Sequence, residues 1–219
     1  AAAGKHFPGH GDTGVDSHHD LPVCELPPDR IRAVELVPFR AAIEARVAFV
    51  LTCHVLFPAF DEEWPATLSS ILVQDLLKDE LGYPGAVLTD DLDMKAIADT
   101  YTAPDAAVQA IAAGCDGVLL CRELTKDPAN DAHAHARVLE ALIHAVEDGR
   151  IPYKRAEDAL ARNRKAKERF LAAPVAPGAA SGEASSTTGR SQGAEITRRC
   201  RCCSRVGRRS SAVSARCPP

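Results

Sequence analysis

The chain has 219 residues, of which 46% are hydrophobic and 26% are charged, and this is an ordinary composition for a globular domain with a sizeable core. Residues 1–173 carry 18 Lys and Arg against 28 Asp and Glu, whereas residues 174–219 carry eight Arg against two Glu. The acidic body is therefore no candidate for nucleic-acid binding, and no apolar run approaches the roughly 20 residues of a membrane-spanning helix.

The first predicted element is a short strand over residues 4–7, which leads into a polar loop. The stretch from Lys5 to Pro22 reads KHFPGHGDTGVDSHHDLP and contains four histidines, three aspartates and three glycines. Proline and glycine make this backbone irregular, and few of the side chains could anchor it in an apolar core. Polar loops on a rigid scaffold often carry functional sites, so this loop is the first candidate site.

The residues of this loop leave three interpretations open. It could be a solvated loop with incidental histidines. It could bind a metal, but the glycines prevent a helix that would place His6 and His10 on one face, and no Cys pair or Glu completes a ligand pattern. It could also hold an acid/base catalyst, in which Asp16 orients and charges His18 across one intervening residue.

The segment after the loop predicts a helix followed by a buried strand. Apolar residues recur at a roughly helical period over residues 31–45, and Pro38 is expected to divide this helix into two pieces. The run VAFVLTCHV over residues 47–55 predicts a strand buried on both faces of a parallel sheet. His54 lies near the carboxyl end of this strand and is included as a candidate substrate-binding residue.

A second helix is expected to begin at a capping Ser69 or Thr67 and to stop at Gly82. A third strand over residues 85–89 then runs directly into the acidic segment DDLD, which begins at Asp90. This carboxylate is placed for chemistry because barrel active sites form at the carboxyl ends of strands, although an aspartate here could simply cap the next helix. The remaining predicted elements are helices over 94–98, 105–113, 129–146 and 153–171 and a strand over 117–121.

This order of strands and helices predicts about four parallel βα units, an α/β fold. A (β/α)8 TIM barrel needs about 250 residues, so residues 1–171 are expected to form only part of one. Residues 172–219 have an Arg-, Ser- and Cys-rich composition that predicts a disordered C-terminal tail. The cysteines before residue 172 are isolated from one another, which favours a reduced protein and a cytoplasmic location.

The stretch from Lys5 to Pro22 matches the pattern K-H-F-P-G-H-G-D-T-x-x-D-S-H-x-x-L-P at every fixed position. This pattern resembles the signature of family 3 glycoside hydrolases of the β-N-acetylhexosaminidase type. The resemblance extends to about Leu171 and implies that the chain is the C-terminal half of the catalytic TIM barrel. It also implies a small carbohydrate substrate, no cofactor, and a missing N-terminal half-barrel that activity would require.

The same resemblance implies roles for individual residues. The segment LTDDLDM is similar to the nucleophile motif of the family, so Asp90 would attack the sugar, and Asp16 and His18 would act as the general acid/base dyad. The residues that would hold sugar hydroxyls are Lys5, His6 and His10.

The implied activity is that of a retaining exo-β-N-acetylglucosaminidase. It would hydrolyse terminal N-acetylglucosamine from peptidoglycan (muropeptide) or chitin-like fragments through a covalent glycosyl-aspartate intermediate. Three alternatives stay open: a β-glucosidase, a glycoside phosphorylase of the same family, or an inactive truncated fragment.

Overall fold

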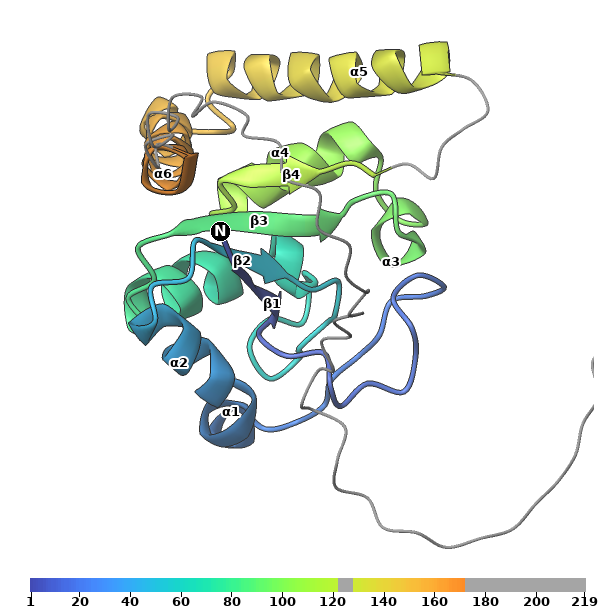
Figure 1. Cartoon of the computed structure of the whole chain (residues 1–219). Coiled ribbons are helices and arrows are strands. Elements are labelled where there is room, and N and C mark those ends of the chain that lie inside the picture. Colours follow the sequence, from blue (N-terminus) through green and yellow to red (C-terminus); the bar gives the residue numbers. More distant parts are fainter. Residues whose placement is uncertain (122–127, 172–219) are drawn as a thin grey trace, which may run out of the picture. The chain divides into compact units, whose positions relative to one another are not determined.

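The computed structural model describes residues 1–121 and 128–171, and for residues 128–132 and 171 it describes the backbone alone (Figure 1). The predicted disordered tail over 172–219 lies outside the described residues. Four parallel strands form one sheet, and they lie side by side in the order in which they occur in the chain. The strands are β1 Ala3–Phe7, β2 Phe49–Thr52, β3 Ala86–Asp91 and β4 Gly117–Leu119.

Helices connect the strands, as the periodicity of the sequence predicts. The helical segment over residues 31–45 is divided at Leu36, and Pro38 lies in the first turn of α2, where the helix does not need its missing N–H. Gly82 follows η3 with a φ of +66°, a left-handed conformation that favours glycine. None of the described helices has the length and apolar character needed to cross a membrane. The helices are α1 Pro28–Arg30, η1 Ile31–Glu35, α2 Val37–Glu44, η2 Ala66–Leu68, η3 Ile71–Glu80, α3 Lys95–Ala98, α4 Ala103–Ala113, α5 Pro128–Glu147 and α6 Tyr153–Leu171.

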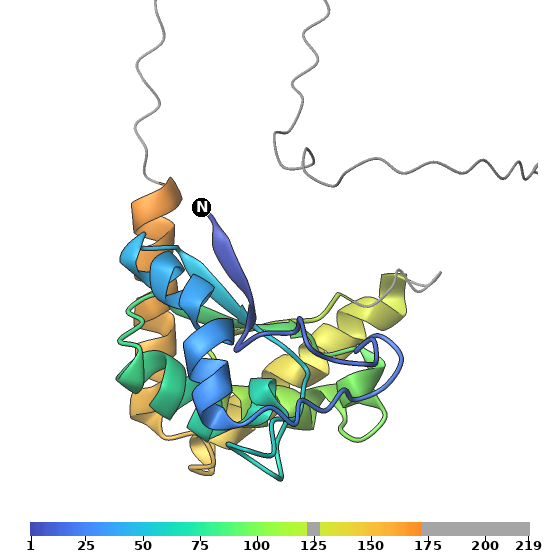
Figure 2. The same ribbon diagram turned by 90° about the horizontal axis from the view of Figure 1, so that it is seen from below.

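The helices cover one face of the sheet. α2 contacts β1 and α4 contacts β4, and Figure 2 shows the helices, from α1 in blue to α5 in yellow, along one side of the strands. On the covered face Val50 and Val87 are fully buried in the main hydrophobic core. On the opposite face Phe49, Leu51 and Leu88 are only partly buried. The prediction of a strand buried on both faces is therefore wrong for β2, because no described layer packs against the face that carries Phe49 and Leu51.

The last helix, α6, lies across the amino ends of the strands. Arg162 Nη1 donates hydrogen bonds to the carbonyl oxygens of Tyr83 and Gly85, which precede β3, at 3.1 and 2.9 Å. The side-chain amide of Asn163 donates to the carbonyl oxygen of Asp116, which precedes β4. Figure 1 shows α6 at the end of the sheet where β3 begins, away from the arrowheads. Two helices therefore follow β4, and the second closes one end of the sheet.

A buried ionic cluster attaches α6 to this end of the sheet. The fully buried carboxylate of Asp116 accepts hydrogen bonds from Lys78 Nζ at 2.9 Å, from Arg155 Nη2, and from the N–H of Val87 at 2.9 Å. Burial lowers the pKa of Lys78, and the charge of the neighbouring carboxylate opposes that shift. One carboxylate thus balances two cations from η3 and α6, and it also binds the backbone of β3.

Candidate active site

Asp90 is the carboxylate at the carboxyl end of β3. Side chains alternate between the two faces of a strand, so Asp90 shares the open face of the sheet with Leu88. Its Oδ1 accepts a hydrogen bond from the N–H of Asp91 at 2.9 Å, and its Oδ2 lies 3.4 Å from Nε2 of His6 on β1. These contacts orient the carboxylate, which stays partly exposed and can therefore meet a ligand at the edge of the sheet.

His6 provides an uncharged neighbour for this carboxylate. Burial lowers the pKa of His6 below its ordinary value, and the charge of Asp90 opposes the shift without cancelling it. The imidazole is therefore mostly neutral at neutral pH, and it lies beside Asp90 without neutralising it. Lys5, the preceding residue on β1, is exposed. Of these two expected sugar-binding residues, the structure brings His6 to Asp90 and leaves Lys5 exposed.

The expected pair of Asp16 and His18 forms on the loop. His18 Nδ1 lies 2.7 Å from Asp16 Oδ1, which also accepts the backbone N–H of His18 at 2.9 Å. The side-chain hydrogen bond to Asp16 raises the pKa of His18, and the backbone hydrogen bond from His18 is the main cause that lowers the pKa of Asp16. The two side chains are 61% and 69% exposed, so the ring of His18 is accessible from solvent.

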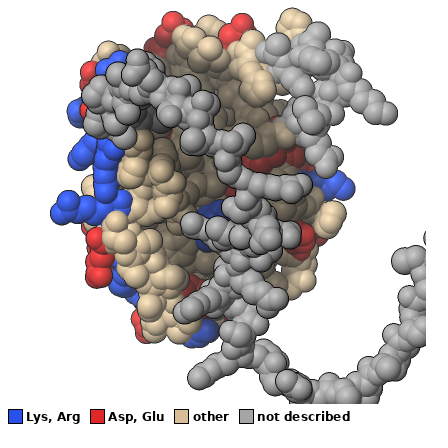
Figure 3. Space-filling model, in the orientation of Figure 1, with Lys and Arg blue, Asp and Glu red and all other residues tan. Residues whose placement is uncertain are grey.

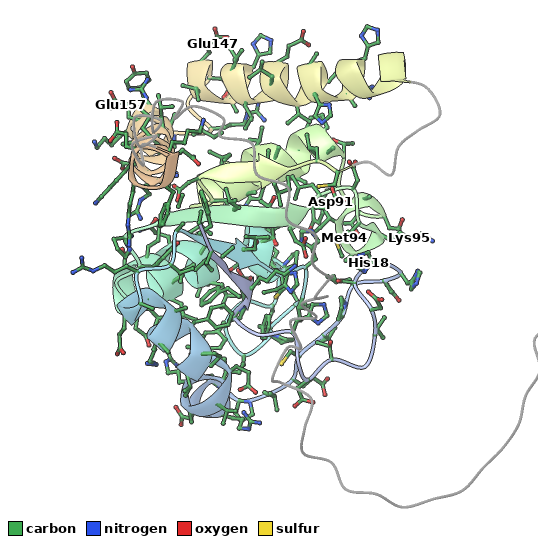
Figure 4. The ribbon with its side chains drawn as sticks, in the orientation of Figure 1. His18, Asp91, Met94, Lys95, Glu147 and Glu157 are labelled. Atoms are coloured by element: carbon green, nitrogen blue, oxygen red, sulfur yellow. The ribbon has the colours of Figure 1, made fainter. Side chains whose placement is uncertain are left out.

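The loop that carries this pair is attached next to the carboxyl end of β3. The N–H of Ala96 in α3 donates to the carbonyl oxygen of Ser17 at 3.3 Å. Figure 4 shows His18 and Asp91 on the same side of the molecule, close to Met94 at the start of α3. The charge of Asp90 contributes to the raised pKa of His18, so the two candidate catalytic groups lie within electrostatic range.

His10 orders the loop from within. Its Nδ1 lies 2.9 Å from Thr13 Oγ1, and its Nε2 lies 3.1 Å from Ser17 Oγ. In this geometry hydrogen bonds within the loop occupy both ring nitrogens, in place of the sugar contact expected for this residue. No three His, Cys, Asp or Glu side chains of the described residues are grouped so that they could hold a metal ion.

His54 binds the backbone at the end of β3, next to Asp90. It is fully buried, its Nε2 donates to the carbonyl oxygen of Asp91 at 2.8 Å, and its Nδ1 lies 2.9 Å from the hydroxyl of Thr67. Burial lowers the pKa of His54, which keeps the ring neutral. The Thr67 hydroxyl beside Nδ1 donates to the carbonyl oxygen of Cys53 at 2.9 Å, and its oxygen lies 2.8 Å from Thr52 Oγ1. Neither ring nitrogen can reach a sugar. The geometry gives His54 a positioning role instead of the expected substrate contact.

The acidic segment after Asp90 serves the strand ends and not a helix cap. Asp91 Oδ1 accepts the N–H of Asp93 at 3.1 Å and the N–H of Cys121 at 2.9 Å, so it joins the ends of β3 and β4. The residue at the N-cap of α3 is Met94, and its side chain makes no capping hydrogen bond. The N-cap position of α3 is therefore occupied by Met94 and not by one of the aspartates.

Thr67 has a role that the sequence interpretation missed. The helix cap is Ser69, whose Oγ accepts the N–H of Leu72 at 3.2 Å, whereas the Thr67 hydroxyl binds the ring of His54. A signal was present in the sequence, because Thr52 and His54 are two polar residues at alternate positions of an otherwise apolar run. Such a pair needs a buried hydrogen-bond partner.

We expect Thr67→Val to lower the free energy of unfolding by about 1–3 kcal/mol, because the isosteric change removes the buried hydroxyl that donates to the carbonyl oxygen of Cys53 and contacts Nδ1 of His54. Denaturant unfolding followed by circular dichroism measures the change. The exposed Thr100→Val is the matched control and should change stability by less than about 0.5 kcal/mol. Equal effects of the two substitutions would contradict the network.

Comparisons with known proteins identify the family of this chain. Residues 1–165 match the family model described as the glycosyl hydrolase family 3 N terminal domain. The chain is 44% identical over 129 residues to a β-hexosaminidase of Alkalilimnicola ehrlichii, a match that covers 59% of this chain and 37% of the relative. It is 33% identical over 178 residues to β-hexosaminidase A of Pseudoalteromonas piscicida, covering 76% of this chain and 29% of that protein.

Solved structures show the same relationship. A family 3 β-N-acetylglucosaminidase from Paenibacillus sp. superimposes with a TM-score of 0.72 at 42% identity, over 86% of this chain and 33% of that one. The β-N-acetylglucosaminidase from Thermotoga maritima superimposes with a TM-score of 0.64 at 28% identity, over 75% of this chain and 34% of that one. The chain spans about a third of the length of the curated relatives it matches. It belongs to glycosyl hydrolase family 3, and its four parallel strands and their helices are part of the TIM-barrel domain of that family.

Proposed function

We propose that residues 1–171 carry the catalytic residues of a retaining exo-β-N-acetylglucosaminidase. One observation carries the proposal: the partly exposed carboxylate of Asp90, next to His6, lies at the edge of the sheet where the loop holds the pair of Asp16 and His18. The sugar specificity is supported by the Paenibacillus and Thermotoga structures, which are β-N-acetylglucosaminidases.

The proposed reaction has two steps, as retention of configuration requires. In the first, an oxygen of Asp90 attacks the anomeric carbon and forms a glycosyl ester, while protonated His18 gives its Nε2 proton to the departing glycosidic oxygen. In the second, neutral His18 takes a proton from water, and the water oxygen attacks the anomeric carbon and releases the Asp90 carboxylate. The second step restores both residues to their starting states.

The geometry also supports a histidine as the proton donor. An imidazole with an ordinary pKa of about 6.5 is close to neutral pH, whereas a carboxylic acid needs strong burial to hold a proton there. The hydrogen bond to Asp16 raises the pKa of His18 further, so the protonated form persists at higher pH. The loop is joined to α3 by the hydrogen bond between Ala96 and Ser17, and we infer that it brings His18 to the substrate after the sugar has bound, as mobile loops do in other enzymes.

A chimera tests the proposed function. In it, residues 1–171 of this chain replace the corresponding part of the Alkalilimnicola ehrlichii β-hexosaminidase, which matches the chain over 129 residues and supplies the rest of the protein. We expect the chimera to hydrolyse an aryl N-acetylglucosaminide. We also expect a fluorosugar inhibitor to label Asp90, and peptide mass spectrometry locates the labelled residue. A folded chimera that shows no turnover, measured beside an active parent enzyme, would refute the proposal.

The 219-residue chain by itself is expected to show no measurable turnover of the same substrate. Its inner sheet face, including Phe49, Leu51 and Leu88, is open in the described residues, so a sugar at Asp90 would lack the surrounding contacts of a closed barrel. The assay compares the chain and the chimera at equal concentration. Turnover by the chain alone would show that the described half of the site suffices.

The pH dependence of the chimera tests the dyad. Asp16 raises the pKa of His18, and the acid must be protonated for the first step, so the activity should be retained up to a higher pH than an isolated histidine allows. Asp16→Asn removes the charge, and the alkaline limb of the kcat/KM profile should therefore move to lower pH. The exposed Asp20→Asn in the same loop is the control and should leave the limb in place. An unchanged limb in Asp16→Asn would contradict the role of Asp16.

The natural substrate follows from the proposed activity. We propose terminal N-acetylglucosamine on muropeptide or chitin-like fragments. A glycoside phosphorylase is the second candidate, because an imidazolium such as that of His18 attracts an anionic acceptor that a carboxylate would repel. The chimera assayed with and without inorganic phosphate separates them: a hydrolase releases the free sugar in both cases, whereas a phosphorylase releases the sugar 1-phosphate.

A further inference from the structure

A cavity lies at the amino ends of the strands, the opposite end of the sheet from Asp90. It has a volume of about 430 Å³ and is lined by the turn after α2, the residues before β3 and the second half of α6. Buried Tyr83, together with Pro84 and Phe170, provides an apolar wall. The cationic side chains that line the cavity are Arg46, Arg162, Lys165 and Arg169.

In the part of the chain that the structure describes, these four cations form no ion pair with an acidic side chain, and the guanidinium of Arg169 lies 4.7 Å from the ring centre of Phe170. The ion pairs formed by arginine elsewhere in the described residues, such as Arg32 with Glu80, include none of the four. Lys165 is likewise in no described ion pair, and Arg162 binds carbonyl oxygens through Nη1 alone. In Figure 3 Lys and Arg side chains gather at the left of the visible face, the side on which α2 and α6 lie in Figure 1. The cavity is therefore a concentration of positive charge on an acidic domain.

The backbone at Arg46 adds a second observation. This residue has a φ of +54°, and it follows α2 in a turn where its N–H donates to the carbonyl of Ile43 at 2.9 Å. Glycine is the usual residue at such a left-handed position after a helix, because a side chain there is disfavoured. The turn does not require an arginine. The side chain of Arg46, whose backbone conformation is unfavourable, lines the cavity.

We propose that this cavity binds a small phosphate-bearing molecule whose organic part lies against Tyr83 and Phe170. Guanidinium groups match phosphate oxygens with paired hydrogen bonds, and Arg46 and Arg169 reach the cavity from two different elements. The volume lies in the range of small-ligand sites, and an apolar wall with a few convergent charges is typical of them. Because the cavity and Asp90 lie at opposite ends of the strands, the proposal does not depend on the hydrolase activity.

Calorimetric titration of the 219-residue chain tests this proposal. The two probes are adenosine monophosphate and inorganic pyrophosphate. We expect saturable binding with a Kd below about 1 mM, tighter for the nucleotide because its base contacts the aromatic wall. Arg46→Gly should weaken the binding about tenfold, the loss of one charge-assisted hydrogen bond, and should keep or raise Tm because it relieves the left-handed backbone. Arg169→Ala should weaken binding similarly.

A matched control removes a positive charge from the same helix outside the cavity. Lys154→Ala on α6 should leave the affinities for both probes unchanged. This result would distinguish binding in the cavity from general electrostatic attraction to the domain. Three results would overturn the proposal: no saturable binding of either probe, equal affinities in the wild type and both cavity variants, or binding of citrate as tight as that of the two phosphate compounds.

Discussion

Replacement of Asp90 by alanine in the chimera is expected to lower kcat/KM for an aryl N-acetylglucosaminide by at least about 10⁴-fold. Asp90 is the carboxylate that projects from the open face at the end of β3, and its neighbour Asp91 is occupied by backbone N–H groups of two other segments. Without it the proposed glycosyl ester with Asp90 cannot form. Azide should partly restore turnover of activated substrates, because a small anion can occupy the vacated space and attack the sugar.

The control for this experiment is Asp99→Ala, an exposed aspartate directly after α3. It should change kcat/KM by less than about threefold and leave Tm unchanged, since surface substitutions away from special features have small effects. A fluorosugar that labelled any residue other than Asp90 in the unmutated chimera would disprove the assignment. Circular dichroism of Asp90→Ala should match the parent, because Asp90 contributes one local hydrogen bond to the fold.

The second large effect is expected on stability. Asp116→Ala should lower the free energy of unfolding by about 3–5 kcal/mol, because it leaves Lys78 and Arg155 without the carboxylate that compensates their charges. For a chain of this size the loss corresponds to a decrease in Tm of roughly 10 °C. Thermal unfolding of the 219-residue chain measures it. The substitution also removes the acceptor for the N–H of Val87, so local protection of β3 from hydrogen exchange should decrease.

An exposed ion pair provides the matched control. Asp148 binds Arg150 at the surface with 49% of its side chain exposed, and Asp148→Ala should cost less than about 1 kcal/mol. The double variant Asp116→Ala with Lys78→Met should be more stable than Asp116→Ala alone, because it no longer buries an uncompensated ammonium group. If Asp116→Ala cost no more than Asp148→Ala, the cluster would not hold α6 to the sheet.

Local patterns in the sequence determined most of the secondary structure. The apolar run over residues 47–55 contains β2, and the apolar period over residues 31–45 contains η1 and α2. The helix is divided at Leu36, and Pro38 follows in the first turn of α2, where its missing N–H is tolerated. The pair of Asp16 and His18 could be predicted for the same reason: two residues with one spacer can meet whatever the rest of the chain does. Such features depend on neighbours in the sequence.

Contacts between distant residues were decided by the tertiary structure. The approach of His6 to Asp90 needs β1 and β3 in one sheet, and the hydrogen bond from His54 to Asp91 spans 37 positions. The placement of α6 across the strand ends likewise depends on partners of Asp116 that are 38 and 39 positions away. The periodicity of a segment shows which of its faces is apolar, but it contains no information on which distant polar group that segment will meet. Only the packed sheet brings these groups within hydrogen-bond distance, because burial then requires each of them to find a partner.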